Sequence, residues 1–180
     1  SANQIPDCVQ QLHSCEYKNP EQITTKSVLI VGSGSSGVQI CRLLCQSKRF
    51  EHIHLSVSKV LVLPEHVFGI QIHKLLHIFG LFDIRNDSLL GKLMYSNLET
   101  KGDPIMRPAP KDLSALFDVH LYGKFEKSDG ALLQFDDGQT LDTSDLTILW
   151  CTGFRGDYAF IEPQDRSATF DHTGYPKHNR

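Results

Sequence analysis

The sequence predicts an α/β fold, with a central parallel sheet, helices on both of its faces and an antiparallel β-meander in the last third. Two patterns support this prediction. An apolar strand leads through a glycine-rich turn into a helix and a second strand, as in the βαβ units of parallel sheets. Short strand-like segments separated by Asp-Gly turns then follow, as in antiparallel hairpins. A length of 180 residues and a hydrophobic content of 40% suit one folded domain.

The first half of the chain supplies the βαβ unit. Residues 27–31 are a continuous apolar run, which predicts a buried parallel strand in the middle of the sheet. The helix over residues 38–45 is apolar around most of its circumference, so we expect it to be covered on several sides. Apolar side chains alternate in residues 53–60 and predict the second strand.

The middle of the chain is less regular. Apolar residues at helical spacing predict an amphipathic helix over residues 67–80, which Gly80 would end. A second helical segment is expected over residues 87–98, and a Pro- and Gly-containing loop over residues 102–110.

The final third has the period of strands. We expect strands at residues 119–125, 131–135 and 146–150, and turns at residues 128–130 and 136–138. The last of these strands should return to the parallel sheet. It would then place Thr152 and Gly153 at the carboxyl end of the sheet, where α/β proteins bind their ligands.

The domain organisation follows from these segments. Residues 26–160 are expected to form the folded domain. Residues 1–25 are polar and irregular and are interpreted as an incoming linker, and residues 161–180 as a linker tail.

Composition excludes several classes of protein. With 18 basic and 21 acidic residues the formal net charge is −3, which argues against a nucleic-acid-binding protein. No apolar run is long enough for a transmembrane helix, and residues 1–7 lack a signal-peptide pattern. The five scattered cysteines, without a Cys-x-x-Cys motif, favour a reducing intracellular location on the cytoplasmic side. A membrane tether in a longer parent protein would lie outside this segment.

Metal binding and hydrolytic chemistry have little support. His52 and His54 share one strand face, and His73 and His77 are four residues apart, but neither pair has the further ligands of a zinc site. Cys41 and Cys45 fall within the predicted helix and are interpreted as small buried residues. We therefore expect no metal site and no catalytic residue in this segment.

The glycine-rich turn carries the clearest functional signal. It follows a strand and opens a helix, which is the context required of a Gly-x-Gly-x-x-Gly dinucleotide-binding motif. The first glycine permits the turn, the second lets a pyrophosphate approach and the third lets helix and strand pack closely. These observations predict a Rossmann-like, three-layer dinucleotide-binding domain. The residues expected around the pyrophosphate are Gly32, Ser33, Gly34, Ser35, Ser36 and Gly37.

The end of the second strand indicates which dinucleotide is bound. NAD- and FAD-binding units place Asp or Glu there to bind the ribose hydroxyls. This sequence has Ser56, Ser58 and Lys59 instead, and no carboxylate. Hydroxyl groups and a lysine would attract the 2′-phosphate that a carboxylate would repel, so NADP(H) is favoured over NAD(H).

A set of motifs occurs in fixed order along the chain. They are His13-Ser14-x-x-Tyr17, the run from Val28 through the glycine turn to Gly37, Leu55-Ser56, Phe135-Asp136-Asp137-Gly138, Asp145 and Thr152-Gly153-Phe154. In these motifs the chain resembles the NADPH-binding domain of class B flavin-dependent monooxygenases, the flavin-containing monooxygenases and their plant and bacterial relatives. The likeness covers roughly residues 5–180.

The resemblance implies a larger parent protein. In that family the NADPH-binding domain is inserted into an FAD-binding domain with its own, earlier glycine loop, which this chain lacks. The implied partner is therefore the FAD domain of the same parent protein. His13, Ser14 and the Cys151-Thr152-Gly153 segment would lie near the nicotinamide and the domain junction. The sequence departs from the family at Asp7 and Val9, where Phe and Gly are usual, and at Cys151, where Ala is usual.

The implied reaction uses NADPH to reduce FAD and O₂ to oxygenate a soft nucleophile such as an amine or sulfide. This segment would contribute the NADPH site and would not turn over alone, and its small-molecule substrate is not encoded here. Two alternatives remain at this stage. One is a domain of another flavin and pyridine-nucleotide oxidoreductase, against which the missing Cys-x-x-Cys argues. The other is a non-catalytic module that senses nucleotide or binds a partner.

Overall fold

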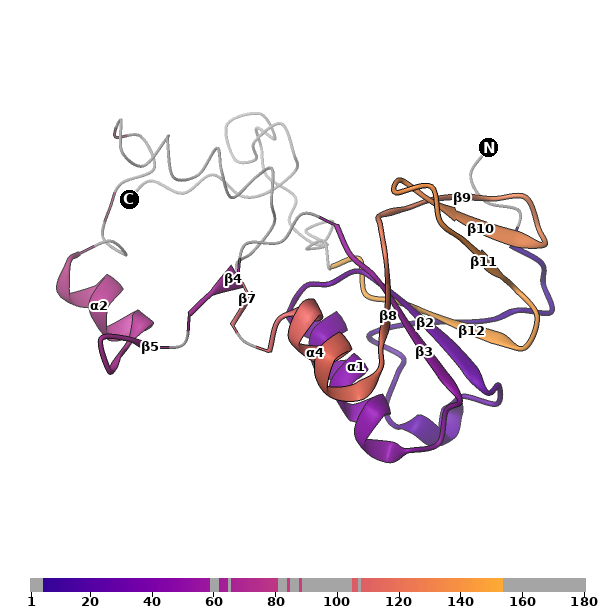
Figure 1. Cartoon of the computed structure of the whole chain (residues 1–180), viewed down its shortest axis with the longest axis horizontal. Helices are drawn as coiled ribbons and strands as arrows, with labels where there is room; N and C mark the ends of the chain where they lie inside the picture. The colour runs from indigo at the N-terminus through magenta and orange to yellow at the C-terminus, as the bar shows by residue number, and fades with distance from the viewer. Residues whose placement is uncertain are drawn as a thin grey trace, which may run out of the picture.

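A five-stranded parallel sheet forms the centre of the protein (Figure 1). The computed structural model describes residues 5–58, 62–64, 66–80, 84, 88, 105–106 and 108–153. In spatial order the strands are β1 (Gln10–His13), β12 (Leu146–Trp150), β2 (Ser27–Val31), β3 (His52–Ser56) and β8 (His120–Tyr122). Every neighbouring pair is parallel, and β2 is the middle strand, as predicted.

One face of this sheet is covered by helices. α1 (Ser35–Ser47) and α4 (Pro110–Phe117) lie side by side against it (Figure 1). Val28 and Ile30 of β2 point to this face and belong to its apolar core, which includes buried residues of both helices. α1 is less enclosed than expected, because Leu43 on its outer side is 54% exposed.

The opposite face corrects the prediction of helices on both sides. Among the described residues it is covered by an antiparallel sheet of β9 (Phe125–Ser128), β10 (Leu132–Phe135) and β11 (Thr140–Asp142). Leu133 and Phe135 of β10 share a buried cluster with Leu29 and Val31 of β2 and Ile148 of β12. The three layers are therefore helices, parallel sheet and antiparallel sheet. Alternating β10 residues bury one face of the strand, which is what this packing requires.

The antiparallel sheet begins where the predicted strand over residues 119–125 divides. β8 ends at Tyr122, and the chain crosses to the second sheet through Gly123 and Lys124. The N–H of Gly123 donates to the Asp137 carboxylate (2.5 Å), and that of Lys124 to Asp136 (2.6 Å). The Asp-Asp-Gly turn between β10 and β11 therefore anchors the crossing. The turns at 128–130 and 136–138 are confirmed, whereas β11 was not predicted.

The prediction that residues 1–25 are irregular is wrong for Gln10–His13, which form the edge strand β1. The strand was missed because it contains glutamines where apolar residues would be expected. The Gln10 amide donates to the carbonyl of Gln22 (2.7 Å) and accepts the hydroxyl of Thr147 (2.9 Å). Val9 and Ile23 on either side of it are buried. Residues beyond 153, including the predicted tail, lie outside the described residues.

The middle segment contains shorter elements than predicted. α2 (Ile72–Ile78) replaces the helix expected over residues 67–80, and a small hairpin of β5 (His66–Val67) and β6 (Ile70–Gln71) precedes it. Gly80 follows the helix with φ +63°, consistent with its predicted role. β4 (Val62–Leu63) pairs in parallel with β7 (Ile105–Met106), and the 3₁₀ turn η1 is Pro20–Gln22. Apart from Ser88, the segment 87–98 lies outside the described residues.

α4 was not predicted, because the sequence before it reads as a proline-rich loop. Pro110 occupies the first helical turn, where a missing N–H costs nothing. The Asp112 carboxylate accepts the N–H of Ala109 at 2.8 Å. The helix then buries Leu113 against the core.

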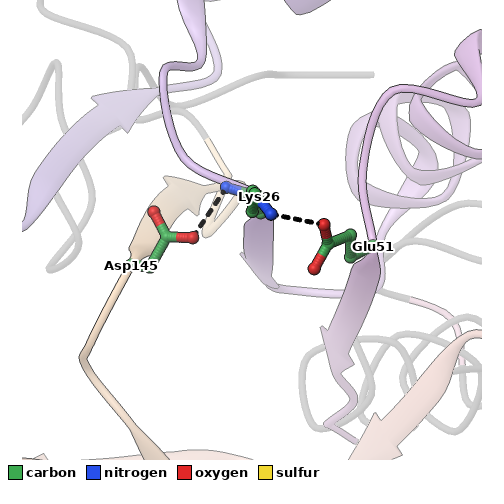
Figure 2. Close-up of polar contacts among 3 residues, drawn as sticks. All are labelled: Lys26, Glu51 and Asp145. Atoms are coloured by element: carbon green, nitrogen blue, oxygen red, sulfur yellow. Dashed lines mark hydrogen bonds and ion pairs between the residues drawn. The ribbon is translucent and has the colours of Figure 1, made fainter.

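The amino end of the sheet is held by polar contacts around Lys26 (Figure 2). Its ammonium group lies 2.6 Å from the Glu51 carboxylate, just before β3. Its backbone N–H donates to the Asp145 carboxylate (3.3 Å), just before β12. Residues that lead into three adjacent strands are thus linked at the amino end of the sheet. Ligands of open α/β sheets bind at the opposite end, where the strands finish.

Candidate functional site

The glycine turn lies at the carboxyl edge of the parallel sheet, between β2 and α1. The N–H of Gly32 donates to the carbonyl of Ser56 at the end of β3 (3.1 Å). The N–H of Cys151, just after β12, donates to the carbonyl of Val31 (2.8 Å). The ends of three adjacent strands are therefore fixed together beneath the turn.

The three glycines have different surroundings. Gly32 has φ +110°, and a Cβ there would overlap the carbonyl oxygen of Cys151. A Cβ at Gly37 would overlap the carbonyl oxygen of Gly32. A Cβ at Gly34 would meet nothing within 4 Å. Gly32 and Gly37 thus allow turn and helix to pack, whereas Gly34 borders open space.

Gly34 is the N-cap of α1, so no cap side chain accepts a hydrogen bond from the N–H groups of the first turn. The first turn of this 13-residue helix contains no acidic residue. The N–H groups at a helix start lack intrahelical partners and lie at the positive end of the helix dipole. Ser35 is exposed and Ser36 half-buried beside them. The arrangement suits an anion such as a pyrophosphate.

Two predicted site serines are buried. Ser33 is 1% exposed, and its hydroxyl has no hydrogen-bond partner within the described structure. Ser56 is 2% exposed, and its hydroxyl is used within the fold. It donates to the carbonyl of Gly123 (2.8 Å) and accepts the N–H of Phe125 (3.1 Å). This geometry commits the Ser56 hydroxyl to the fold, in place of the predicted contact with a 2′-phosphate.

Of the remaining phosphate candidates, Ser58 is exposed just beyond β3, and Lys59 lies outside the described residues. Just after β12, on the other side of β2, Cys151 is buried, and burial raises the pKa of its thiol to about 11, so it acts as an apolar filler. Thr152 and Gly153 are exposed beyond it, with φ +90° at Gly153. These two residues extend from β12 beside the glycine turn.

The His-Ser motif lies two strands from the glycine turn. His13 is the last residue of β1 and is the register partner of Trp150, whose carbonyl accepts the N–H of Ser14 (2.9 Å). The hydroxyl of Ser14 is buried without a partner among the described residues. The structure also brings Cys15 to His13, a contact that the His-x-Cys spacing could have suggested and that the sequence analysis missed.

Three histidines cluster on β3 and β8, at the opposite edge of the sheet from β1. The rings of His54 and His120, register partners on β3 and β8, stack with centroids 5.4 Å apart, and His52 lies 6.3 Å from His54. Burial, followed by repulsion from His120 and His52, lowers the pKa of His54 to about 4. Within the described ranges, no group of three or more His, Cys, Asp or Glu side chains is placed to hold a metal ion. The same residues include no helix with the length and apolarity to cross a membrane.

No family model matches the sequence, but individual relatives do. The chain is 30% identical over 180 residues to an uncharacterized CzcO-like oxidoreductase of Geobacillus kaustophilus, covering 99% of this chain and 48% of the relative. It is 29% identical over 157 residues to the uncharacterized oxidoreductase CzcO of Bacillus subtilis, covering 87% of this chain and 43% of that one. With the monooxygenase aurF of Gibberella zeae it shares 26% identity, over 83% of this chain and 33% of the relative. The chain thus spans about half or less of these relatives.

Solved structures share the fold. A variant of a flavin monooxygenase from Stenotrophomonas maltophilia superposes with a TM-score of 0.57 at 19% identity, over 99% of this chain and 44% of that one. The ornithine N-hydroxylase of Kutzneria sp. 744, described with FADred, NADP⁺ and L-orn, gives a TM-score of 0.55 at 14% identity, over 96% and 49%. The mixed α/β architecture is therefore that of part of these flavin monooxygenases.

Proposed function

Because the chain is homologous to CzcO-like oxidoreductases and flavin monooxygenases, we propose that it is the NADPH-binding portion of a flavin-dependent monooxygenase. The space above Gly34, at the start of α1, carries this proposal. Gly32 and Gly37 are packed so tightly that no side chain fits, yet Gly34 borders a volume that nothing in the described structure fills. A turn that served only to join β2 to α1 would not require a glycine there.

The residues present fit a dinucleotide. The N–H groups of the first turn of α1 would hold the pyrophosphate, with the hydroxyls of Ser35 and Ser36 beside them. The buried hydroxyl of Ser33 lacks a partner, which is costly unless a bound group or water satisfies it. Thr152 and Gly153 would flank the nucleotide from the end of β12.

Selectivity for NADPH would come from Ser58 and Lys59, since no carboxylate follows β3 in the segment Ser56–Lys59. Lysine offers a point charge to a phosphate, in contrast to the planar fork of arginine. Discrimination against NADH would therefore rest on charge, and should weaken as salt is added.

When bound, NADPH would supply a hydride to a flavin. We propose that FAD is held by the FAD domain of the same parent protein, and that the parent oxygenates a soft nucleophile such as an amine or sulfide. This chain's contribution is positioning. α1 would fix the pyrophosphate, and the ends of β12 and β2 would set how closely the nucleotide approaches the sheet. Without the flavin-binding portion the chain should bind nucleotide but not turn over.

Calorimetric titration with NADPH and NADH, at fixed salt, tests the proposal. Wild-type protein should bind NADPH about tenfold or more tightly than NADH, a difference of about 1.4 kcal/mol. Gly34→Val should abolish binding of both, because its side chain would enter the space for the pyrophosphate, where an added Cβ meets no protein atom within 4 Å. Gln39→Val, on the exposed side of α1, is the matched control and should bind as the wild type does.

Two results would contradict the proposal. Wild-type affinity for NADPH in Gly34→Val would show that the pyrophosphate does not lie at this turn. Equal affinity for NADPH and NADH would remove the roles given to Ser58 and Lys59 and leave the rest of the site in place.

A further inference from the structure

A nucleophile and a base meet outside the glycine turn, at the end of β1. The Sγ atom of Cys15 lies 3.0 Å from Nδ1 of His13. The backbone N–H of Cys15 also donates to this nitrogen, at 3.3 Å. Because the N–H of Cys15 is a donor, Nδ1 is the ring nitrogen that carries a lone pair, and the thiol S–H shares this acceptor with the backbone N–H.

The backbone fixes this pair from both sides. His13 is held in β1 beside Trp150, and its N–H donates to the Glu16 carboxylate at 2.9 Å. Its carbonyl accepts the N–H groups of Glu16 (2.9 Å) and Tyr17 (3.1 Å). Tyr17 in turn packs against the apolar core. The turn from His13 to Tyr17 is closed by these bonds, and the N–H of Cys15 holds the imidazole ring against it.

The other thiols of the chain differ from Cys15 in their surroundings. Cys41 and Cys151 are buried, and Cys45 is half-buried, with its thiol hydrogen-bonded to the free thiol of Cys41. Cys8 is exposed like Cys15, but among the described residues no imidazole contacts it. Cys15 is thus the described thiol that combines exposure with a neighbouring base.

The thiolate is the nucleophilic form of cysteine, and an imidazole within hydrogen-bond distance can accept the thiol proton. We propose that His13 and Cys15 form a nucleophilic thiol site that hydrogen peroxide oxidises to a sulfenic acid. His13 accepts the S–H proton, and sulfur attacks one peroxide oxygen and forms an S–O bond. The O–O bond breaks with the transfer of two electrons from sulfur. The leaving hydroxide takes a proton from the imidazolium, so thiol and peroxide become sulfenic acid and water.

The test compares thiols within one molecule. The chain is treated with hydrogen peroxide in the presence of dimedone, which traps sulfenic acids, and labelling of each cysteine is followed over time by peptide mass spectrometry. Cys15 should be labelled several-fold faster than Cys8. His13→Gln should slow Cys15 to the rate of Cys8 and leave Cys8 unchanged, because the imidazole base beside Cys15 has been removed.

His66→Gln replaces an exposed histidine on β5 and is the matched control, which should keep the wild-type ratio of rates. Circular dichroism of each variant checks that the fold is retained. Equal rates for Cys15 and Cys8 in the wild type would overturn the proposal, and this comparison needs no variant. An unchanged ratio in a folded His13→Gln would overturn it as well.

Discussion

At the scale of single residues, the glycine turn separates packing from binding. A Cβ at Gly32 or Gly37 would overlap backbone atoms of a neighbouring segment, whereas a Cβ at Gly34 would meet nothing within 4 Å. A substitution at Gly37 therefore acts first on stability, and a substitution at Gly34 acts first on the ligand. The spacing of the motif predicted both roles, and the structure shows which atoms impose the packing role.

Gly37→Ala should destabilise the fold by about 1–3 kcal/mol, the usual cost of forcing an extra methyl group into a packed interior. The new Cβ would overlap the carbonyl oxygen of Gly32, and a backbone atom cannot move aside as a flexible side chain can. Thermal and urea unfolding measure the effect. Gly34→Ala is the comparison and should unfold at nearly the wild-type midpoint, so equal midpoints for both variants would contradict the assignment.

His54 should make the protein less stable in mild acid. Its pKa is about 4 in the folded protein, against 6.5 as the ordinary value. Between these values the unfolded chain binds a proton that the folded chain does not, so stability is complete above pH 6.5 and falls as pH falls towards 4. The loss by pH 5 is about 2 kcal/mol. The groups facing His54 are His52, His120 and Tyr122.

Urea unfolding at pH 7 and pH 5 measures this loss in the wild type and in His54→Leu, which should lose less stability between the two values. His66→Gln, an exposed histidine, should behave as the wild type. An identical pH dependence in His54→Leu would mean that other groups cause the acid sensitivity.

At the scale of elements, the crossing from β8 to β9 joins the two sheets. Ser56 at the end of β3 bonds to both sides of that crossing, and the Asp136-Asp137 turn bonds to its middle. The Asp-Asp-Gly segment was predicted as a turn from its local pattern and also belongs to the motifs of the family resemblance. In the structure its carboxylates accept hydrogen bonds from backbone N–H groups. Such bonds lower the pKa of Asp137, and the N–H of Gln139 makes the largest contribution.

Ser56→Ala should therefore lower stability by about 1–2 kcal/mol, since it leaves the carbonyl of Gly123 and the N–H of Phe125 without their partner. The ratio of NADPH to NADH affinity should not change. Chemical denaturation and calorimetry give the two readouts. If Ser56→Ala lost the preference for NADPH at unchanged stability, the result would support the contact of Ser56 with the 2′-phosphate that the sequence predicted.

At the scale of the whole molecule, the amino-terminal segment is part of the folded unit. β1 adds the edge strand beside β12, and Val9 and Ile23 are buried in the apolar clusters on the two faces. If residues 1–25 were only a linker, their removal would leave the stability of the domain unchanged. The pairing of β1 with β12 predicts instead that the domain needs them for stability.

Deletion of residues 1–25 should lower the unfolding midpoint sharply or abolish cooperative unfolding, because it exposes one edge of β12 and the apolar residues beneath β1. Differential scanning calorimetry of the truncated and full chains measures this. A truncated protein with the midpoint of the full chain would show that β1 contributes little and that the segment behaves as a linker.

The sequence by itself determined the βαβ unit, the middle position of β2, the glycine turn and the hairpin turns, because these depend on local periodicity and on backbone conformations that few residues adopt. Tertiary structure decided the rest. β1 is held by glutamine side chains that bond to distant residues, and α4 follows a segment rich in proline. The antiparallel sheet covers a face where helices were expected, because β10 buries Leu133 and Phe135 there. Ser56 became a structural link because its hydroxyl meets Gly123, 67 residues further along the chain, and no local pattern records such a contact. The contact of Cys15 with His13 is local in sequence, but the spacing alone does not say that the two side chains turn toward each other.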